Sequence, residues 1–163
     1  MCGWIMIQSQ QDIDYLMSQY GGFHDSCLVG LSYQNGAAVD DNNSMCLGRS
    51  EQRRLRVLFH SQWNKKALEL CFLGVRKFCV AGWEDNYFCD IFDCHLSFHD
   101  DLFAGSKNPI IVWADNADFS PKDMWGRSIL AEPSITFIAA DNLQWRFTEK
   151  GMSSPMDDLM GEE

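Results

Sequence analysis

The stretch RLRVLFHSQWNKKALELCFL, residues 54–73, decides the fold. In its first half Leu55, Val57 and Phe59 alternate with Arg54, Arg56, Leu58 and His60, and a period of two predicts a β-strand with one buried face. Residues 67–73 are mostly apolar on both faces, with Glu69 as the one charged residue, and this predicts a second, more deeply buried strand. The polar residues 63–66 between them supply a turn. The stretch therefore predicts a β-hairpin.

Upstream of the hairpin, residues 9–20 predict the only long helix. Ser9 is a favourable N-cap, and Asp12 three positions later resembles a capping box. Apolar residues then follow the i, i+3, i+4, i+7 spacing of one helix face, namely Ile13, Leu16, Met17 and Tyr20. Gly21 and Gly22 predict the helix end, because glycine adopts the left-handed cap conformation without strain.

The rest of the chain reads mainly as strands. Period-two or buried runs predict strands at residues 27–33, which end at Asn35-Gly36, and at 87–99 and 110–114. Residues 37–50 are polar and predict a loop with a short strand at 45–47, and residues 115–133 predict a long loop or a helical turn. A terminal hairpin is predicted from 134–139 and 143–147, joined by Ala140-Asp141-Asn142. These elements predict an α+β fold, mainly antiparallel β-sheet with one N-terminal amphipathic helix. We expect a single domain over 1–148 and a mobile acidic tail over 149–163.

Composition indicates the class of protein and the compartment in which we expect it. The chain has 163 residues, of which 46% are hydrophobic, and this is typical of one globular domain. Its seven cysteines include no CxxC pair, and the start MCGWIMIQSQ lacks a secretory pattern. Apolar runs are far shorter than the ~20 residues that span a bilayer. We therefore expect a cytoplasmic protein with reduced thiols and no membrane contact.

Charge suggests a protein partner. The net charge of −10 argues against nucleic acid, because phosphate binding requires clustered cations. Residues 49–77 nevertheless hold eight of the 13 basic residues against two acidic ones. Within this segment Arg54, Arg56, Lys65 and Lys66 are the candidate binding residues, for an acidic protein partner or a second copy of the chain. The alternative is that they balance charges within the same chain.

Four residues are candidates for catalysis: His24, Asp25, Asp93 and His95. His24 and Asp25 are adjacent, so in an extended strand over 23–33 they would point to opposite faces. Asp93 and His95 would share a face about 7 Å apart, a spacing that suits a polar cluster or a weak general base. The sequence has no GxSxG elbow and no glycine-rich phosphate loop, so it identifies no nucleophile or phosphate site.

A metal site is not expected. His95 and His99 are the best pair, but four residues of strand span about 13–14 Å, whereas each Zn–N bond is about 2 Å. The cysteines also lack ligand spacing. We therefore expect no metal and no cofactor.

A resemblance adds a functional class. The stretches GGFHDSCL (21–28), CDIFDCHLSFHDD (89–101) and NLQWRF (142–147) resemble a loose group of small uncharacterised bacterial cytoplasmic proteins, some of which are grouped with toxin-immunity proteins. The resemblance implies a cytoplasmic location and carries over no catalytic residue. We expect a binding or interaction protein of unknown partner, immunity-like in character. The alternative is a small hydrolase that uses a His/Asp site, and an enzyme is the less favoured class.

Overall fold

A computed structural model describes residues 3–81, 89–125 and 135–151. In chain order its elements are β1 (Ile5–Ile7), α1 (Gln10–Gln19), η1 (Gly21–Phe23), β2 (Ser26–Gln34), β3 (Ala38–Val39), β4 (Met45–Cys46), η2 (Ser50–Gln52), β5 (Arg54–Ser61), β6 (Lys66–Cys79), β7 (His95–His99), β8 (Ile110–Ala114), η3 (Pro121–Met124) and β9 (Phe137–Glu149). Every strand pairing among these elements is antiparallel, which confirms the predicted α+β fold with its helix near the N-terminus.

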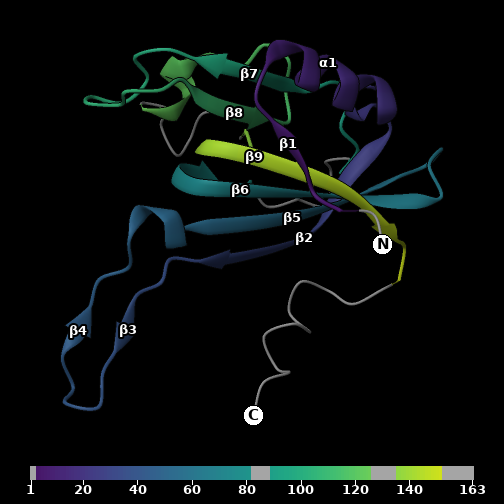
Figure 1. Ribbon diagram of the computed structural model, residues 1–163. Coiled ribbons are helices and arrows are strands. Elements are labelled where there is room, and N and C mark those ends of the chain that lie inside the picture. Colours follow the sequence, from purple (N-terminus) through teal and green to yellow (C-terminus); the bar gives the residue numbers. More distant parts are fainter. Residues whose placement is uncertain (1–2, 82–88, 126–134, 152–163) are drawn as a thin grey trace.

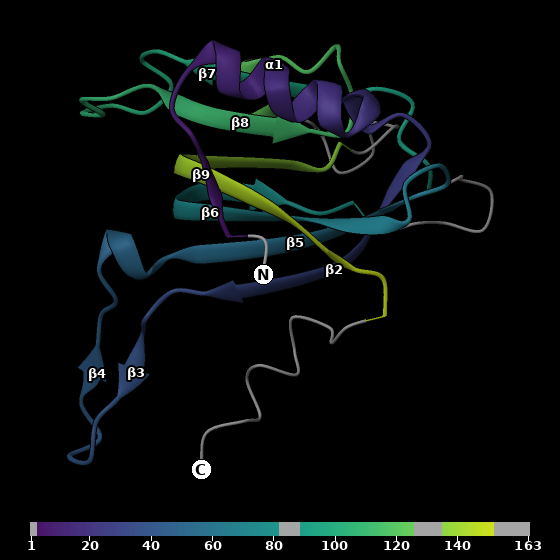
Figure 2. The same ribbon diagram turned by 45° about the vertical axis from the view of Figure 1, so that its right-hand side comes forward.

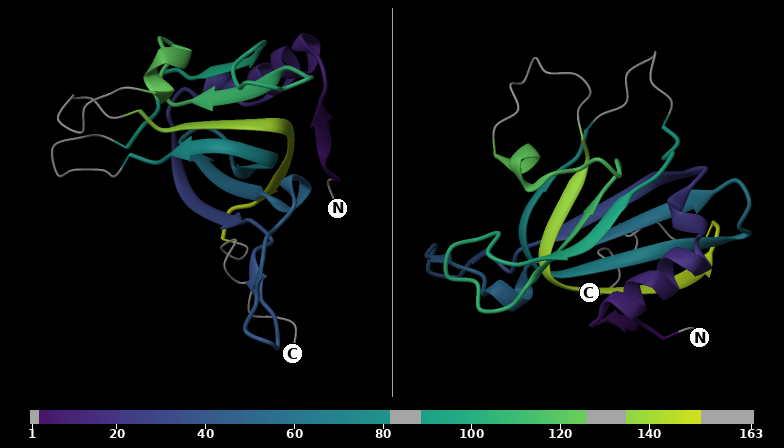
Figure 3. Two further views of the ribbon diagram at one scale, coloured as in Figure 1. Left: turned by 90° about the vertical axis from the view of Figure 1, so that its left-hand side faces the viewer. Right: turned by 90° about the horizontal axis from the view of Figure 1, so that it is seen from above.

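The main sheet has the order β2-β5-β6-β9-β8-β7, and β1 also pairs with β9 (Figure 1). One edge of β9 pairs with β6 along its whole length. The other edge pairs with β8 over residues 137–140 and with β1 over residues 143–145. The partner of β9 therefore changes at Asp141 and Asn142, and β9 bends along its length (Figure 3, left).

The same bend passes through β6. A register shift between Val75 and Lys77 leaves Arg76 as an extra residue, and such bulges bend strands. Gly74 has a φ of +66°, and a Cβ there would overlap the Asp141 carboxylate. Glycine is therefore required both by the backbone conformation and by the space at this point. The bend curls the two halves of the sheet around a shared interior.

The main core fills this curled interior and is covered by α1 (Figure 2). Its largest fully buried side chains are Trp113, Tyr20, Phe23, Phe59 and Phe72. The helix contributes Ile13 and Leu16. A second, smaller cluster lies on the outer face of β8 and β9 and includes Phe119, Met124 and Phe137.

Several predictions from the sequence are confirmed. Helix α1 begins after Ser9, which forms a reciprocal capping box with Asp12. Strand β8 has the predicted bounds, and β5 and β6 form the predicted hairpin, although β6 continues to Cys79. Strand β2 ends before Asn35-Gly36, where Gly36 has a φ of +72°.

Two strand predictions are wrong. The expected terminal hairpin is one continuous strand, β9, because β6 pairs on both sides of Asp141 and the chain bends there without reversing its direction. The expected strand over 87–99 is reduced to β7, which starts at His95. Phe92 is 76% exposed rather than aligned with the buried face. Residues 82–88, 126–134 and 152–163 lie outside the described part, so most of the predicted tail does too, while Glu149 belongs to β9.

A seam connects the two ends of the curled sheet. Edge strand β2 meets the segment before β7 through an antiparallel bridge between Ser26 and Ile91. The amide of Ile91 donates to Ser26 O at 2.6 Å, and the amide of Asp25 donates to Ile91 O at 3.0 Å. The FHDS stretch therefore sits where the sheet comes closest to closing.

An arm formed by residues 35–49 projects from the opposite end of β2 (Figures 1 and 2). It contains the small sheet of β3 and β4, in which Val39 pairs with Met45. Every residue from 33 to 47 is exposed. The arm returns through η2 to β5.

Candidate functional site

At the seam, His24 lies between two residues that have an unusual backbone conformation, Phe23 and Asp25. Gly21, Gly22, Phe23 and Asp25 have φ values of +57°, +63°, +67° and +55°. Positive φ is unfavourable for residues other than glycine, so the surrounding packing must hold Phe23 and Asp25 in place. Phe23 is fully buried, with its ring 5.2 Å from those of Tyr20 and Phe59.

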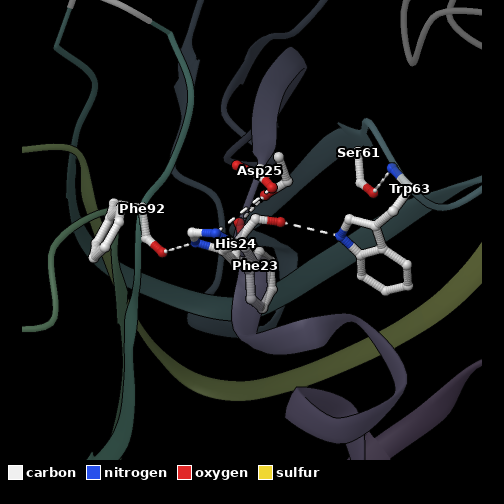
Figure 4. A network of polar contacts seen from close by, with 7 residues as sticks. Phe23, His24, Asp25, Ser61, Trp63 and Phe92 are labelled. Atoms are coloured by element: carbon white, nitrogen blue, oxygen red, sulfur yellow. Dashed lines mark hydrogen bonds and ion pairs between the residues drawn. The ribbon is translucent and has the colours of Figure 1, made fainter.

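Hydrogen bonds fix His24 from two sides (Figure 4). Its Nδ1 lies 2.7 Å from Phe92 O, and because a carbonyl only accepts, Nδ1 carries the proton. The indole Nε1 of Trp63 donates to His24 O at 3.1 Å. The ring is thus oriented by the segment before β7, and its backbone is held by the turn between β5 and β6.

His24 and Asp25 lie side by side, against expectation. His24 Nε2 is 3.6 Å from Asp25 Oδ2. They do not point to opposite faces as an extended strand over 23–33 predicts, because Asp25 has a left-handed backbone and the strand starts only at Ser26. Both side chains are about half exposed, at 51% and 48%. Such a pair forms a solvated ion pair when His24 is protonated, worth about 0–1 kcal/mol.

The other two catalytic candidates lie elsewhere. Asp93 Oδ1 accepts the amide of Ala117 at 3.2 Å, so it holds the loop after β8. His95 contacts His99 and the ring of Phe119. In the described part of the chain no three His, Cys, Asp or Glu side chains are grouped as a metal site would need. The four predicted residues therefore do not form one cluster.

His95 and His99 approach each other closely. Their Nε2 atoms are 2.8 Å apart, although both residues lie in the intact strand β7. The predicted separation of about 13–14 Å holds for the backbone of a strand and is wrong for the side chains, which close the distance. The two residues share a face, and their side chains lean toward one another over Ser97. Burial lowers the pKa of both rings, and the neighbouring His99 lowers that of His95 further.

This pair should make stability depend on pH. A lowered pKa in the folded state means that the unfolded chain binds protons more readily, so folding stability is complete above the unfolded pKa of about 6.5 and falls as the pH drops below it. We expect the free energy of unfolding, from urea titrations at pH 7.5, 6.5 and 5.5, to fall less in His95→Gln than in the wild type. Ser97→Ala, on the same face, should keep the wild-type slope. Equal slopes in all three proteins would contradict the assignment.

The candidate binding residues are divided between three places. Arg56 is bound to buried Glu69, with Nη2 2.6 Å from Oε1, as the charge-balance alternative predicts. Arg54 is exposed at the start of β5. Lys65 and Lys66 are exposed at the far end of the hairpin, about 25–30 Å away at 3.4 Å per residue. The hairpin therefore does not present the four as one patch.

Arg54 borders a groove at the bend of the sheet. The groove has a volume of about 1010 Å³ and is bounded by the start of α1, the β7–β8 loop and the bend of β6 and β9. Arg76 in its wall pairs with Asp141 at 2.8 Å. Lys107 and Glu51 add one charge of each sign. Its size suits a small ligand, but its charges nearly cancel and do not select one.

Asp115 was not singled out from the sequence. Burial raises its pKa to about 6, although its carboxylate accepts the amide of Thr136 at 3.0 Å. It follows β8 directly, beside a small cavity of about 20 Å³ that Trp113 and Ile91 also line. Raised carboxyl pKa values occur at catalytic sites and also in structural networks. The raised pKa of Asp115 follows from the burial of the end of β8. The short apolar run at 110–114 predicts a buried strand but does not show that the residue after it is buried too.

Comparison with known proteins gives no family. No family, no curated protein and no solved structure matches this chain. The resemblance of the FHDS stretch to immunity-grouped proteins therefore stays a prediction. Among the described residues, no helix is both long and apolar enough to cross a membrane.

Proposed function

We propose that this chain is a protein-binding module that contacts its partner through the arm of residues 35–49. The observation that carries the proposal is the exposure of Val39, Met45 and Leu47, which are 59%, 70% and 86% exposed. Val39 and Met45 are paired across the arm, and Leu47 follows directly after the end of β4. Burying one such side chain is worth about 1.5–3 kcal/mol, so this stripe could supply most of a binding energy.

The arm is preorganised for binding. At its tip Asp40 Oδ1 accepts the amides of Asn42 and Ser44, both at 2.9 Å. At its base Gly36 and Gly48 allow the two strands to approach, since a Cβ on either would overlap Gln52 or the backbone of Asn35. A binding element that is already ordered loses less conformational entropy when it associates.

Charge indicates the chemistry of the partner. The chain carries a net charge of −10, and Asp40 and Asp41 lie at the arm tip. A partner with an apolar cleft and a basic rim would bury the stripe and attract the tip at long range. An immunity-like role, in which that partner is a toxin, is the specific form that the FHDS resemblance favours. Residues 21–28 would then stabilise the seam of the sheet rather than contact the partner.

Removing the apolar stripe should separate binding from folding. In the triple variant V39S/M45S/L47S we expect association with the partner to weaken by about 100-fold or more, because three buried apolar side chains are lost. The free energy of unfolding should change by less than about 0.5 kcal/mol, because all three residues are exposed in the folded chain. Binding is measured by calorimetry and stability by urea titration.

The matched control is Val80→Ser, since Val80 is 45% exposed on the body rather than the arm. Val80→Ser should bind normally. A photo-crosslinker at position 47 identifies the partner, and one at Gln62, on the β5–β6 turn, should capture less of it. Sedimentation equilibrium tests whether the partner is a second copy. A triple variant that binds as the wild type does, or a crosslinker at 47 that captures no protein, would refute the proposal.

A further inference from the structure

The pair of His95 and His99 has the geometry of a metal-binding site. The chain contains four histidines, and these two face each other on one face of β7 with their Nε2 atoms 2.8 Å apart. Their ring centroids are 5.1 Å apart, and the rings are inclined by 34°. Across the strand pair they lie opposite Ala114 and Ile110 of β8. The ring of Phe119 covers His95 from a centroid distance of 5.3 Å.

The separation of the two nitrogens fits one class of coordination geometry. Two imidazole nitrogens bound at about 2.0 Å and at right angles lie about 2.8 Å apart, whereas tetrahedral angles place them about 3.3 Å apart. In the free protein the 2.8 Å separation is a hydrogen bond between the rings, and neighbouring positions of a square-planar or octahedral complex could be occupied with little movement of either ring. Cu²⁺ and Ni²⁺ favour such positions and bind imidazole, whereas structural Zn²⁺ is nearly always tetrahedral.

The protonation state also suits a metal. A metal binds the lone pair of neutral imidazole. In the free protein one Nε2–H donates to the other Nε2, and the ring that donates must move its proton to Nδ1 before both lone pairs are available. After that shift both Nε2 lone pairs can face one metal ion.

We propose that His95 and His99 form a two-histidine site for a divalent first-row transition metal of the Cu²⁺ or Ni²⁺ type. The protein supplies two neighbouring positions, and water or a small ligand fills the others. The proposal replaces the sequence-based expectation of no metal, which rested on a backbone separation that the side chains overcome. It is independent of the arm and of any partner protein.

The test uses the full chain and Ni²⁺, which unlike Cu²⁺ does not oxidise the free thiols. Paramagnetic Ni²⁺ broadens the imidazole signals of bound histidines in long-range ¹H–¹⁵N spectra. At substoichiometric Ni²⁺ and pH 7.5 we expect the signals of His95 and His99 to broaden first. Those of His24, which lies just before β2, and His60, which lies in β5, are internal controls. Broadening of all four signals together, or of none, would overturn the proposal.

Single variants provide a second readout. In His95→Gln and His99→Gln the calorimetric affinity for Ni²⁺ should fall by at least about tenfold, because each removes one of two ligands. Excess Ni²⁺ should raise the melting temperature of the wild type but not of these variants. His60→Gln is the matched control and should keep both effects. If either β7 variant bound Ni²⁺ as tightly as the wild type, the cysteines or the termini would be the ligands and the proposal would be wrong.

Discussion

Replacing Glu69 with Gln is expected to lower the free energy of unfolding by about 3 kcal/mol or more, since breaking a buried ion pair typically costs 3–5 kcal/mol. Glu69 lies in the first third of β6 and is 3% exposed. Its Oε1 is 2.6 Å from Arg56 Nε, and its Oε2 is 2.6 Å from Arg146 Nε. One carboxylate therefore neutralises two guanidinium groups on the neighbouring strands, and glutamine would remove this neutralisation from both.

The measurement is urea unfolding followed by tryptophan fluorescence. Glu51→Gln is the matched control, because Glu51 is an exposed acid near the same strands and should cost less than about 0.5 kcal/mol. Replacing all three charged residues by apolar ones, as in E69L/R56M/R146L, should recover most of the loss. A cost below about 1 kcal/mol for Glu69→Gln would show that water screens the three charges more than their burial indicates.

Gly74→Ala is expected to cost about 2–3 kcal/mol, because it combines a left-handed backbone with a steric overlap. Gly74 has a φ of +66°, and the new Cβ would displace the Asp141 carboxylate from Arg76. Gly105→Ala is the matched control. Gly105 has a φ of +79° but open space around it, so this variant should incur only the backbone cost of about 1 kcal/mol. Equal losses in the two variants, measured by urea titration, would mean that the Asp141 contact is unimportant.

The elements that the sequence predicted well are those determined by near neighbours. The capping box and apolar stripe of α1 lie within 12 residues, and the β5–β6 hairpin within 20. The wrong prediction of a terminal hairpin in place of β9 arises because distant residues determine the structure there. Asp141-Asn142 resembles a turn locally, but its structure depends on Gly74 and Arg76, about 65 residues earlier in the chain. The bulge that bends β6 leaves no local pattern of its own.

The candidate sites were likewise predicted only as far as local sequence determines them. Residue types identified His24, Asp25, His95 and His99 as noteworthy, but not how they are arranged. The proximity of His24 and Asp25 depends on a positive φ at Asp25, which tertiary contacts enforce against the preference of the residue. The contact between His95 and His99 depends on side-chain rotamers, which a strand pattern does not specify. The arm was predicted only as a polar loop with a short strand, because exposure is a property of the folded chain.

The long ladder between β6 and β9 also has a consequence for synthesis on the ribosome. Strand β6 can pair with β5 as soon as both emerge, because they are joined by a short turn. Its other edge pairs with β9, which begins roughly 60 residues later and emerges after about 3–12 s at typical translation rates. Until then the apolar edge of residues 67–75 is open to neighbouring nascent chains. The chaperone requirement of this protein should therefore depend on how quickly its C-terminal third is translated.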